Sequence, residues 1–255
     1  MVALGLFTYD HIAGRTDLPK ATWVTSAQLM DRDPSLRSQD LVGGYEFSDA
    51  QMDDQALGLW VAEQALSAGV TIREGVQVHA VSATGGVTIN GETLPYGRII
   101  NVAGPWAVKL LQQSGLRSPF HLDAVRGSHL MLAAPCAHPY LLEVPGKRQI
   151  FFVLPWKGAT LIGTTEVRQS LDEPIACSDA EQAYLLAVYR HYFPTQHPVV
   201  TGSFAGLRPL IHSSDDPNRM TREYAIHRDG QLLSVLGGKW TTANSLARFV
   251  ERSLS

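Results

Sequence analysis

Two strand-and-turn segments decide the fold, and the first of them is Arg98-Ile-Ile-Asn-Val-Ala-Gly-Pro-Trp106. Its apolar run is typical of a buried parallel strand, and Gly104-Pro105 predicts a turn into a helix. The second segment is Ser234-Val-Leu-Gly-Gly-Lys-Trp-Thr-Thr242, in which a strand at residues 232–236 precedes a final helix at about residues 242–252. Glycine lets a backbone approach a flat or phosphorylated ligand, so both turns are candidate ligand contacts.

Between and before these segments the pattern alternates between helices and short strands. Asp53 predicts the start of a helix that ends at Gly69, and Asn90-Gly91 is a strong hairpin signal. A helix over residues 178–192 carries a capping box formed by Ser178 and Glu181. Further strands are predicted at residues 45–49, 70–72, 76–81, 87–89, 128–133, 149–155, 159–165, 203–209 and 223–227. The expected fold class is therefore α/β (α+β), with a mixed or antiparallel sheet in the second half of the chain.

Bulk composition excludes several classes of protein. The chain has 255 residues, 45% of them apolar and 18% charged, and its net charge of -3 provides no electrostatic footprint for nucleic acid. Cys136 and Cys177 are too few and too far apart for a disulfide framework or a zinc site, so two reduced thiols are expected. No apolar stretch of membrane-spanning length and no signal peptide is present. We expect a cytoplasmic protein, and peripheral contact with a membrane stays open.

Two cations stand where an anion or an electron-rich ring would bind. Lys239 lies at a predicted helix N-terminus, which does not favour a cation by itself, so a bound anion or ring is favoured over a purely structural role. Arg208 lies near the end of an apolar strand and needs a carboxylate or phosphate partner. A ligand, or a buried ion pair with Glu166 or Glu223, satisfies that need equally well.

Other polar residues are weaker evidence for a functional site when each is taken alone. His129 alternates with apolar neighbours on a predicted strand, which favours a hydrogen-bonded core histidine over a catalytic base. Arg222 could be a second anion contact, but an exposed charge at a strand edge is the simpler interpretation. The sequence shows no metal-ligand spacing, nucleophile elbow or P-loop, so hydrolase and kinase functions lose support and no metal is expected.

Taken in order, nine segments resemble the FAD-dependent glycerol-3-phosphate dehydrogenases, a family with a fold like that of D-amino-acid oxidase. They are residues 5–11 (Gly5-Leu-Phe-Thr-Tyr-Asp-His11), 46–54, 101–106, 126–129 (Arg126-Gly-Ser-His129), 152–156, 161–166, 206–210 (Gly206-Leu-Arg-Pro-Leu210), 221–224 and 237–242. Each segment is weak singly, but the ordered set covers nearly the whole chain.

The resemblance implies an enzyme that oxidises sn-glycerol 3-phosphate to dihydroxyacetone phosphate and passes electrons through FAD to quinone at the membrane. It implies flavin contacts at Val78, Gly104, Gly238, Lys239 and Thr241, substrate contacts at Arg208 and Arg222, and a base at His129 or Lys239, with Arg208 included in the catalytic set. It divides the chain into a partial Rossmann-like FAD subdomain at residues 45–110 and 232–255 and a substrate-binding subdomain at residues 1–44 and 111–231.

The chain departs from the family where FAD would be anchored. No G-x-G-x-x-G is present in the 255 residues, and the family's Thr-Thr-Asp is Thr164-Thr165-Glu166 here. We therefore expect an N-terminally truncated chain or fragment that binds FAD weakly or not at all. Two other functions stay open, which are a non-catalytic module that binds glycerol 3-phosphate and a related FAD-dependent oxidase of amino or hydroxy acids.

Overall fold

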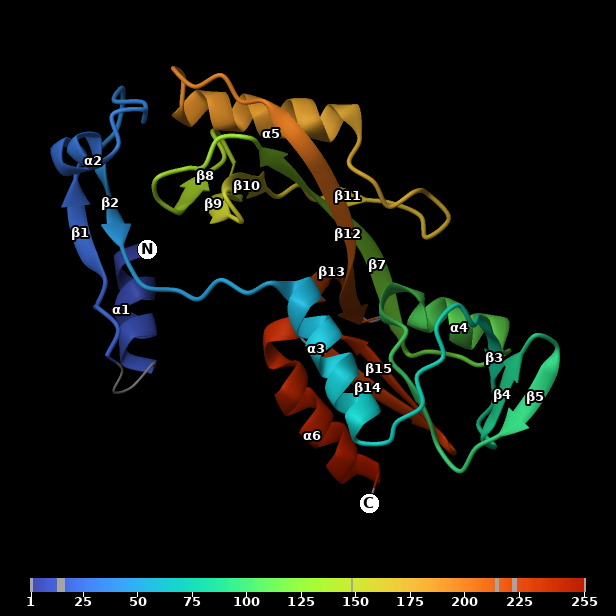
Figure 1. Cartoon of the computed structure of the whole chain (residues 1–255). Coiled ribbons are helices and arrows are strands. Elements are labelled where there is room, and N and C mark those ends of the chain that lie inside the picture. The colour runs from blue at the N-terminus through green and yellow to red at the C-terminus, as the bar shows by residue number, and fades with distance from the viewer. Residues whose placement is uncertain (1, 13–16, 148, 214–215, 222–223, 255) are drawn as a thin grey trace. The chain divides into compact units, whose positions relative to one another are not determined.

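The computed structural model describes residues 2–12, 17–147, 149–213, 216–221 and 224–254, which divide into two compact units (Figure 1). Unit 1 comprises residues 1–53, 129–164 and 177–204, and unit 2 comprises residues 54–128, 165–176 and 205–255. Two long strands, β7 (Phe120–Leu132) and β12 (Val200–Ser213), have residues in both units. Each unit is therefore assembled from three separate stretches of the sequence.

Unit 1 is an antiparallel sheet covered by one helix. Its strands are β8 (Tyr140–Glu143), β9 (Ile150–Trp156) and β10 (Ala159–Gly163), and β10 pairs with the end of β7. Helix α5 (Asp179–Tyr192) lies along this sheet (Figure 1) and buries apolar side chains against it. The shared core contains Leu130, Leu132, Phe151, Val153, Ile162, Leu185, Val188 and Tyr189. Unit 1 also contains α1 (Val2–Ile12), β1 (Thr22–Thr25), α2 (Ser26–Arg32) and β2 (Gly43–Glu46).

The capping box predicted for α5 is confirmed. The Ser178 hydroxyl accepts a hydrogen bond from the backbone N–H of Glu181 at 3.3 Å, and the Glu181 carboxylate accepts one from the backbone N–H of Ser178 at 3.0 Å. Each bond satisfies a donor that the first turn of a helix leaves without an internal partner. The sequence therefore placed the start of this helix correctly.

Unit 2 contains the two segments that the sequence singled out. Its helices are α3 (Asp54–Ser67), α4 (Ala107–Gln113) and α6 (Ala243–Leu254), with the 3-10 turns η1 (Gly104–Trp106) and η2 (Trp240–Thr242). Its strands are β3 (Val78–Val81), β4 (Gly86–Ile89), β5 (Glu92–Pro95), β6 (Ile99–Asn101), β11 (Val167–Arg168), β13 (Asp216–Thr221), β14 (Tyr224–Asp229) and β15 (Leu232–Gly237).

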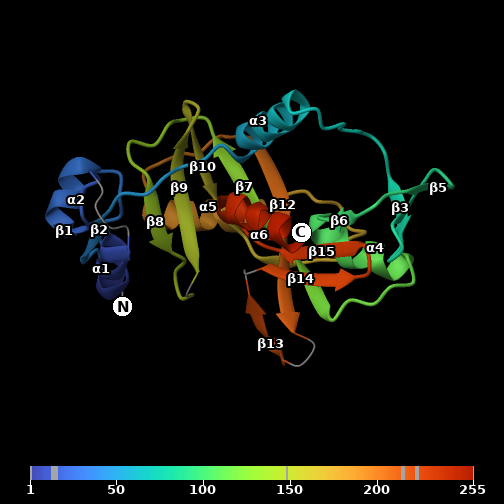
Figure 2. The ribbon, with the colours of Figure 1, turned by 90° about the horizontal axis from the view of Figure 1, so that it is seen from below.

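The centre of unit 2 is a three-stranded sheet in the order β14-β15-β6. Alternate residues of β15 face opposite sides: Leu232 and Leu236 pack with α4, whereas Leu233 and Val235 pack with α6. Figures 1 and 2 show α6 beside β14 and β15, and Figure 1 shows α4 on the other side of these strands. The continuous apolar run of β15 is thus explained by burial on both faces.

The predicted mixed fold is confirmed, but several strand boundaries are wrong. Residues 70–72 form no strand, and the strand predicted from Val76 begins at Val78. Strand β7 begins at Phe120, eight residues before the predicted start, and β12 extends at both ends. In the part of the chain described, no helix is both long and apolar enough to cross a membrane.

Candidate functional site

The two glycine turns lie at the same edge of the central sheet of unit 2. Strands β6 and β15 are parallel, with Asn101 opposite Ser234, so the carboxyl ends of both strands point to one edge. The buried Asn101 amide donates hydrogen bonds to the carbonyl of Ala107 at 3.0 Å and to the Ser234 hydroxyl at 3.4 Å. Ligands of open α/β sheets bind outside the carboxyl ends of parallel strands, so this edge is the candidate site.

Backbone conformation explains why both turns carry glycine. Gly104 has φ +55° and Gly238 has φ +94°, a region that side-chain-bearing residues rarely adopt. A Cβ on Gly104 would meet no atom within 4 Å, so the space above this backbone is open. Two half-exposed indoles, Trp106 and Trp240, follow the glycines. An open backbone flanked by aromatic surface is suited to a flat ring.

Lys239 and Thr241 extend the same edge. Lys239 is the N-cap residue of η2, its side chain is exposed, and its carbonyl accepts a hydrogen bond from the Thr242 hydroxyl at 3.1 Å. Thr241 is an exposed residue of that turn. The structure thus brings together four of the predicted cofactor contacts, Gly104, Gly238, Lys239 and Thr241. The fifth, Val78, lies in a separate sheet (β3-β4-β5) and packs on the cluster of Leu111 and Leu232.

Arg208 lies on the unit 2 part of β12, next to a buried threonine. Its half-buried guanidinium donates to the carbonyl of Thr165 at 3.4 Å, and the Thr165 hydroxyl accepts a hydrogen bond from the backbone N–H of Ser128 at 2.9 Å. A guanidinium carries five N–H donors in a planar fork, which is the geometry that binds carboxylate and phosphate oxygens. Arg222, the second predicted substrate arginine, lies outside the described residues.

His129 belongs to unit 1, where its ring is enclosed between two neighbours. It pairs with Gly163 across the β7–β10 ladder, and its imidazole stacks on Phe204 with ring centroids 4.9 Å apart at 11°. A Cβ added to Gly163 would lie 2.2 Å from Cδ2 of this imidazole. The ring therefore occupies the space that the missing side chain leaves, and glycine at 163 fixes its position.

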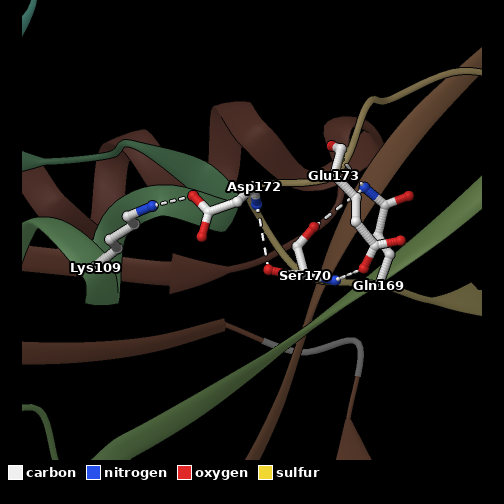
Figure 3. Close-up of polar contacts among 5 residues, drawn as sticks. All are labelled: Lys109, Gln169, Ser170, Asp172 and Glu173. Carbon is white, nitrogen blue, oxygen red and sulfur yellow. Dashed lines mark hydrogen bonds and ion pairs between the residues drawn. The ribbon is translucent and has the colours of Figure 1, made fainter.

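One feature of unit 2 was missed by the sequence-based prediction, namely a hydrogen-bonded loop after β11 (Figure 3). The backbone N–H of Ser170 donates to the Glu173 carboxylate at 2.7 Å, and Asp172 forms an ion pair with Lys109 at 2.6 Å. Lys109 lies on α4, which follows the Gly104 turn. The ion pair therefore links the loop after β11 to that helix. The spacing of Ser170 and Glu173 matches a capping box, which is the signal that could have revealed the loop.

The residues at this edge are suited to contact the ring system of a flavin, but not its pyrophosphate. The open backbone at Gly104 offers a surface for a planar ring system, and Lys239 and Thr241 supply polar groups at the same edge. Gly238 is more enclosed, since a Cβ added there would lie 3.4 Å from Leu246. No G-x-G-x-x-G cradle for a pyrophosphate occurs in the sequence. Among the residues that the structure describes, no cluster of His, Cys, Asp and Glu could hold a metal ion.

Comparison with known proteins identifies a family whose members depend on FAD. Residues 7–244 match the family described as FAD dependent oxidoreductase. The chain is 31% identical to the aerobic glycerol-3-phosphate dehydrogenase of Escherichia coli (strain K12), over 100% of the chain and 54% of that protein. It is 32% identical to the D-erythritol 1-phosphate dehydrogenase of Brucella abortus (strain 2308), over 97% of the chain and 53% of that protein.

A solved structure extends the comparison to the fold. The glycerol-3-phosphate dehydrogenase from Bacillus halodurans, complexed with FAD, superposes with a TM-score of 0.77 at 25% sequence identity, over 91% of this chain and 48% of the other. The chain thus spans about half the length of the curated relatives it matches.

Proposed function

The chain belongs to the FAD-dependent oxidoreductase family, a family of enzymes, and we propose that it supplies the substrate-binding part of a polyol-phosphate dehydrogenase. The expected substrate is sn-glycerol 3-phosphate, the product dihydroxyacetone phosphate and the electron acceptor a quinone. The relatives named above, a glycerol-3-phosphate and an erythritol-phosphate dehydrogenase, support this substrate class. The observation that carries the proposal is the shared edge of β6 and β15, where Asn101 donates hydrogen bonds to Ala107, after the Gly104 turn, and to Ser234, on the strand that leads to Gly238.

We assign the contacts to the flavin ring to that edge, and the contact to adenine to Val78 in the separate β3-β4-β5 sheet. The backbones of Gly104 and Gly238 would lie against the flavin ring, Lys239 and Thr241 would contact its polar rim, and Val78 would contact adenine. Bound FAD supplies the acceptor for the hydride that leaves the carbinol carbon. Residues 45–110 and 232–255 are proposed as the FAD-binding portion, and residues 1–44 and 111–231 as the substrate-binding portion.

We assign the substrate phosphate to two arginines and the general base to a histidine or a lysine. Arg208 and Arg222 would bind the phosphate dianion, because a guanidinium matches two phosphate oxygens with parallel hydrogen bonds. Oxidation of the carbinol also releases the hydroxyl proton, which His129 or Lys239 would accept as the general base. The proposed location is the cytoplasm, with peripheral contact at the inner face of the cell membrane where quinone is found.

Flavin absorbance tests the cofactor part of the proposal. Purified chain mixed with FAD and passed through gel filtration is expected to lose nearly all of its flavin, because the sequence has no pyrophosphate cradle. Yellow colour that stays with the protein and bleaches on addition of glycerol 3-phosphate would show instead that the 255 residues form a complete redox site.

Calorimetry tests the substrate part separately. Glycerol 3-phosphate is expected to bind the chain without FAD, and Arg208→Gln is expected to weaken binding about tenfold or more through loss of a charge-assisted hydrogen bond. Arg248→Gln, an exposed arginine of α6, is the matched control. Equal affinity of the wild-type chain for glycerol and glycerol 3-phosphate would exclude a phosphate-binding role for Arg208. Binding with no redox activity under any condition would favour a non-catalytic module.

A second candidate is an FAD-dependent oxidase of amino or hydroxy acids. The fold of the chain also superposes on glycine oxidase from Geobacillus kaustophilus, with a TM-score of 0.71 at 22% identity. Competition by glycine that displaces glycerol 3-phosphate, or binding of glycine with the higher affinity, would favour this candidate.

A further inference from the structure

The guanidinium of Arg208 is held by a backbone oxygen from another part of unit 2. Its Nη1 atom donates a hydrogen bond to the carbonyl of Thr165 at 3.4 Å. Arg208 lies on β12, whereas Thr165 lies two residues before β11, and both belong to unit 2. The position of the guanidinium therefore depends on the direction in which the Thr165 carbonyl points.

Strand β11 is fixed in register against β7. Val167 pairs with Arg126, and the N–H of Gln169 donates to the carbonyl of Ala124 at 3.0 Å. The side chains of Arg126 and Gln169 form a further hydrogen bond across the same pair of strands at 2.6 Å. Thr165 therefore follows from a strand whose register is set by both backbone and side-chain contacts.

The hydrogen bonding at Thr165 departs from this register. In an antiparallel ladder, hydrogen-bonded pairs recur at every second residue. The bond from Gln169 to Ala124, continued by four residues, would place Thr165 opposite Ser128 and direct the Ser128 N–H to the Thr165 carbonyl. The structure shows a different acceptor, because the Ser128 N–H donates to the Thr165 hydroxyl at 2.9 Å.

This exchange of acceptors requires Thr165 to be turned out of the pleat. Side chains of a regular strand stand roughly perpendicular to the sheet, whereas the N–H groups of the ladder lie in its plane. Ser128 is fully buried and Thr165 is 3% exposed, so the Ser128 N–H must find its acceptor within the protein. The hydroxyl serves as that acceptor, and the carbonyl of the same residue receives Arg208.

We propose that Thr165 is a positioning residue for Arg208, because its hydroxyl takes the N–H of Ser128 and thereby keeps its carbonyl directed at the guanidinium. This role rests on the proposed function, in which Arg208 binds the substrate phosphate. A guanidinium that is already held at one oxygen loses less freedom when a ligand binds. Without the hydroxyl, the buried Ser128 N–H turns to the Thr165 carbonyl and competes with Arg208 for it.

Proton–nitrogen NMR of the full chain tests the contact without any ligand. The Arg208 side-chain signal is assigned by its loss in Arg208→Gln. Thr165→Val preserves the shape of the side chain and removes the hydroxyl, so it is expected to shift this signal, whereas Thr165→Ser retains the hydroxyl and is expected to restore it. Thr160→Val is the matched control, because Thr160 is a buried threonine of unit 1 whose hydroxyl donates to the Ala134 carbonyl at 2.7 Å.

Calorimetry with glycerol 3-phosphate tests the consequence for binding. Thr165→Val is expected to weaken binding about fivefold, which corresponds to the loss of one hydrogen bond that orients Arg208. Thr165→Ser is expected to restore the affinity, and Thr160→Val is expected to leave it unchanged although it also removes a buried hydroxyl. In the Arg208→Gln background, Thr165→Val is expected to have no further effect on affinity.

The two measurements separate this role from the proposed function. An Arg208 signal that Thr165→Val leaves in place overturns the proposal, as does unchanged affinity in a chain whose binding depends on Arg208. Equal losses of affinity in Thr165→Val and Thr160→Val would assign the effect to lowered stability and would also overturn it. If the wild-type chain does not bind glycerol 3-phosphate, the proposed substrate is wrong, and the NMR signal still decides whether Thr165 positions Arg208.

Discussion

The close approach of His129 to Gly163 predicts that a single methyl group at position 163 destabilises unit 1. A Cβ built on Gly163 lies 2.2 Å from Cδ2, 2.8 Å from Nε2 and 2.9 Å from Cγ of the imidazole. The ring is also held by stacking on Phe204, so a shift away from position 163 disturbs that contact. Gly163→Ala must therefore displace the ring from this stack or shift the β7–β10 ladder.

The expected cost follows from overpacking. Forcing an extra methyl group into a packed site costs about 1–3 kcal/mol, and loss of an aromatic stack removes roughly 0.5–1.5 kcal/mol more. An opposing effect acts on the unfolded chain, since glycine to alanine at a permitted backbone conformation stabilises by about 0.4–1 kcal/mol. Gly163 is not among the residues with positive φ, so that gain applies. The net expectation is a loss of roughly 1–3 kcal/mol.

A double-mutant cycle with His129→Ala isolates the steric contact. Once the imidazole is absent, Gly163→Ala has no ring to meet and is expected to be neutral or to stabilise by about 0.4–1 kcal/mol. The free energy of unfolding of the four proteins is measured by urea denaturation. Gly202→Ala is the matched control, because Gly202 is a strand glycine of the same unit with no atom within 4 Å of an added Cβ. Additive effects of the two changes, within about 0.5 kcal/mol, would refute the steric account.

Three further predictions concern other parts of the chain. Gly104→Ala is expected to lower the free energy of unfolding by about 1–2 kcal/mol, because a side chain disfavours the φ of +55° at this position. Urea denaturation measures the loss, and Gly97→Ala is the control, since an added Cβ meets nothing within 4 Å at either position. Lys109→Ala is expected to cost no more than about 1 kcal/mol and to lose its effect in high salt, since the side chains of its ion pair with Asp172 are 38% and 79% exposed; a larger, salt-independent loss would contradict this. Tyr140 donates a hydrogen bond to the Asp33 carboxylate at 2.7 Å, and burial together with Asp33 raises the pKa of Tyr140. The stability that this pair contributes is therefore present below the ordinary tyrosine pKa of about 10 and is lost as the pH rises above it. Tyr140→Phe is expected to remove this alkaline loss, measured by unfolding at a series of pH values, and an unchanged pH profile would contradict it.

Local turn chemistry was predictable because it depends on a few adjacent residues. Asn90 and Gly91 both adopt positive φ, 50° and 84°, and join β4 to β5 as the Asn-Gly signal predicts. The strands that were missed or misplaced depend on distant partners. Residues 70–72 have strand-like composition, yet Val70 and Ile72 are exposed, and none of the described strands pairs with them.

The beginning of β7 shows the opposite error. Residues 120–127 include Asp123 and Arg126 and show no clean alternation, but pairing of Arg126 with Val167 in β11 extends the strand. That pairing joins positions 41 apart in the sequence, beyond any local window. Ser128, the first residue of the predicted strand, donates its backbone N–H to the hydroxyl of the buried Thr165 beside Arg208. That contact joins residues 37 apart and is likewise beyond a local window.

The candidate flavin edge shows how far sequence reasoning reaches. Each glycine turn was visible separately, but their meeting depends on the parallel pairing of β6 with β15, and the bond from Asn101 to Ser234 joins residues 133 apart. A polar amide inside an apolar strand was nevertheless visible in the sequence. Because a buried amide must be hydrogen-bonded, Asn101 required a partner that its own strand could not supply. Ala107, after the following turn, supplies one such partner at 3.0 Å, and Ser234 of β15 supplies the other at 3.4 Å. The sequence therefore indicated that Asn101 needs partners, but the pairing with β15 was needed to show that Ser234 is one of them.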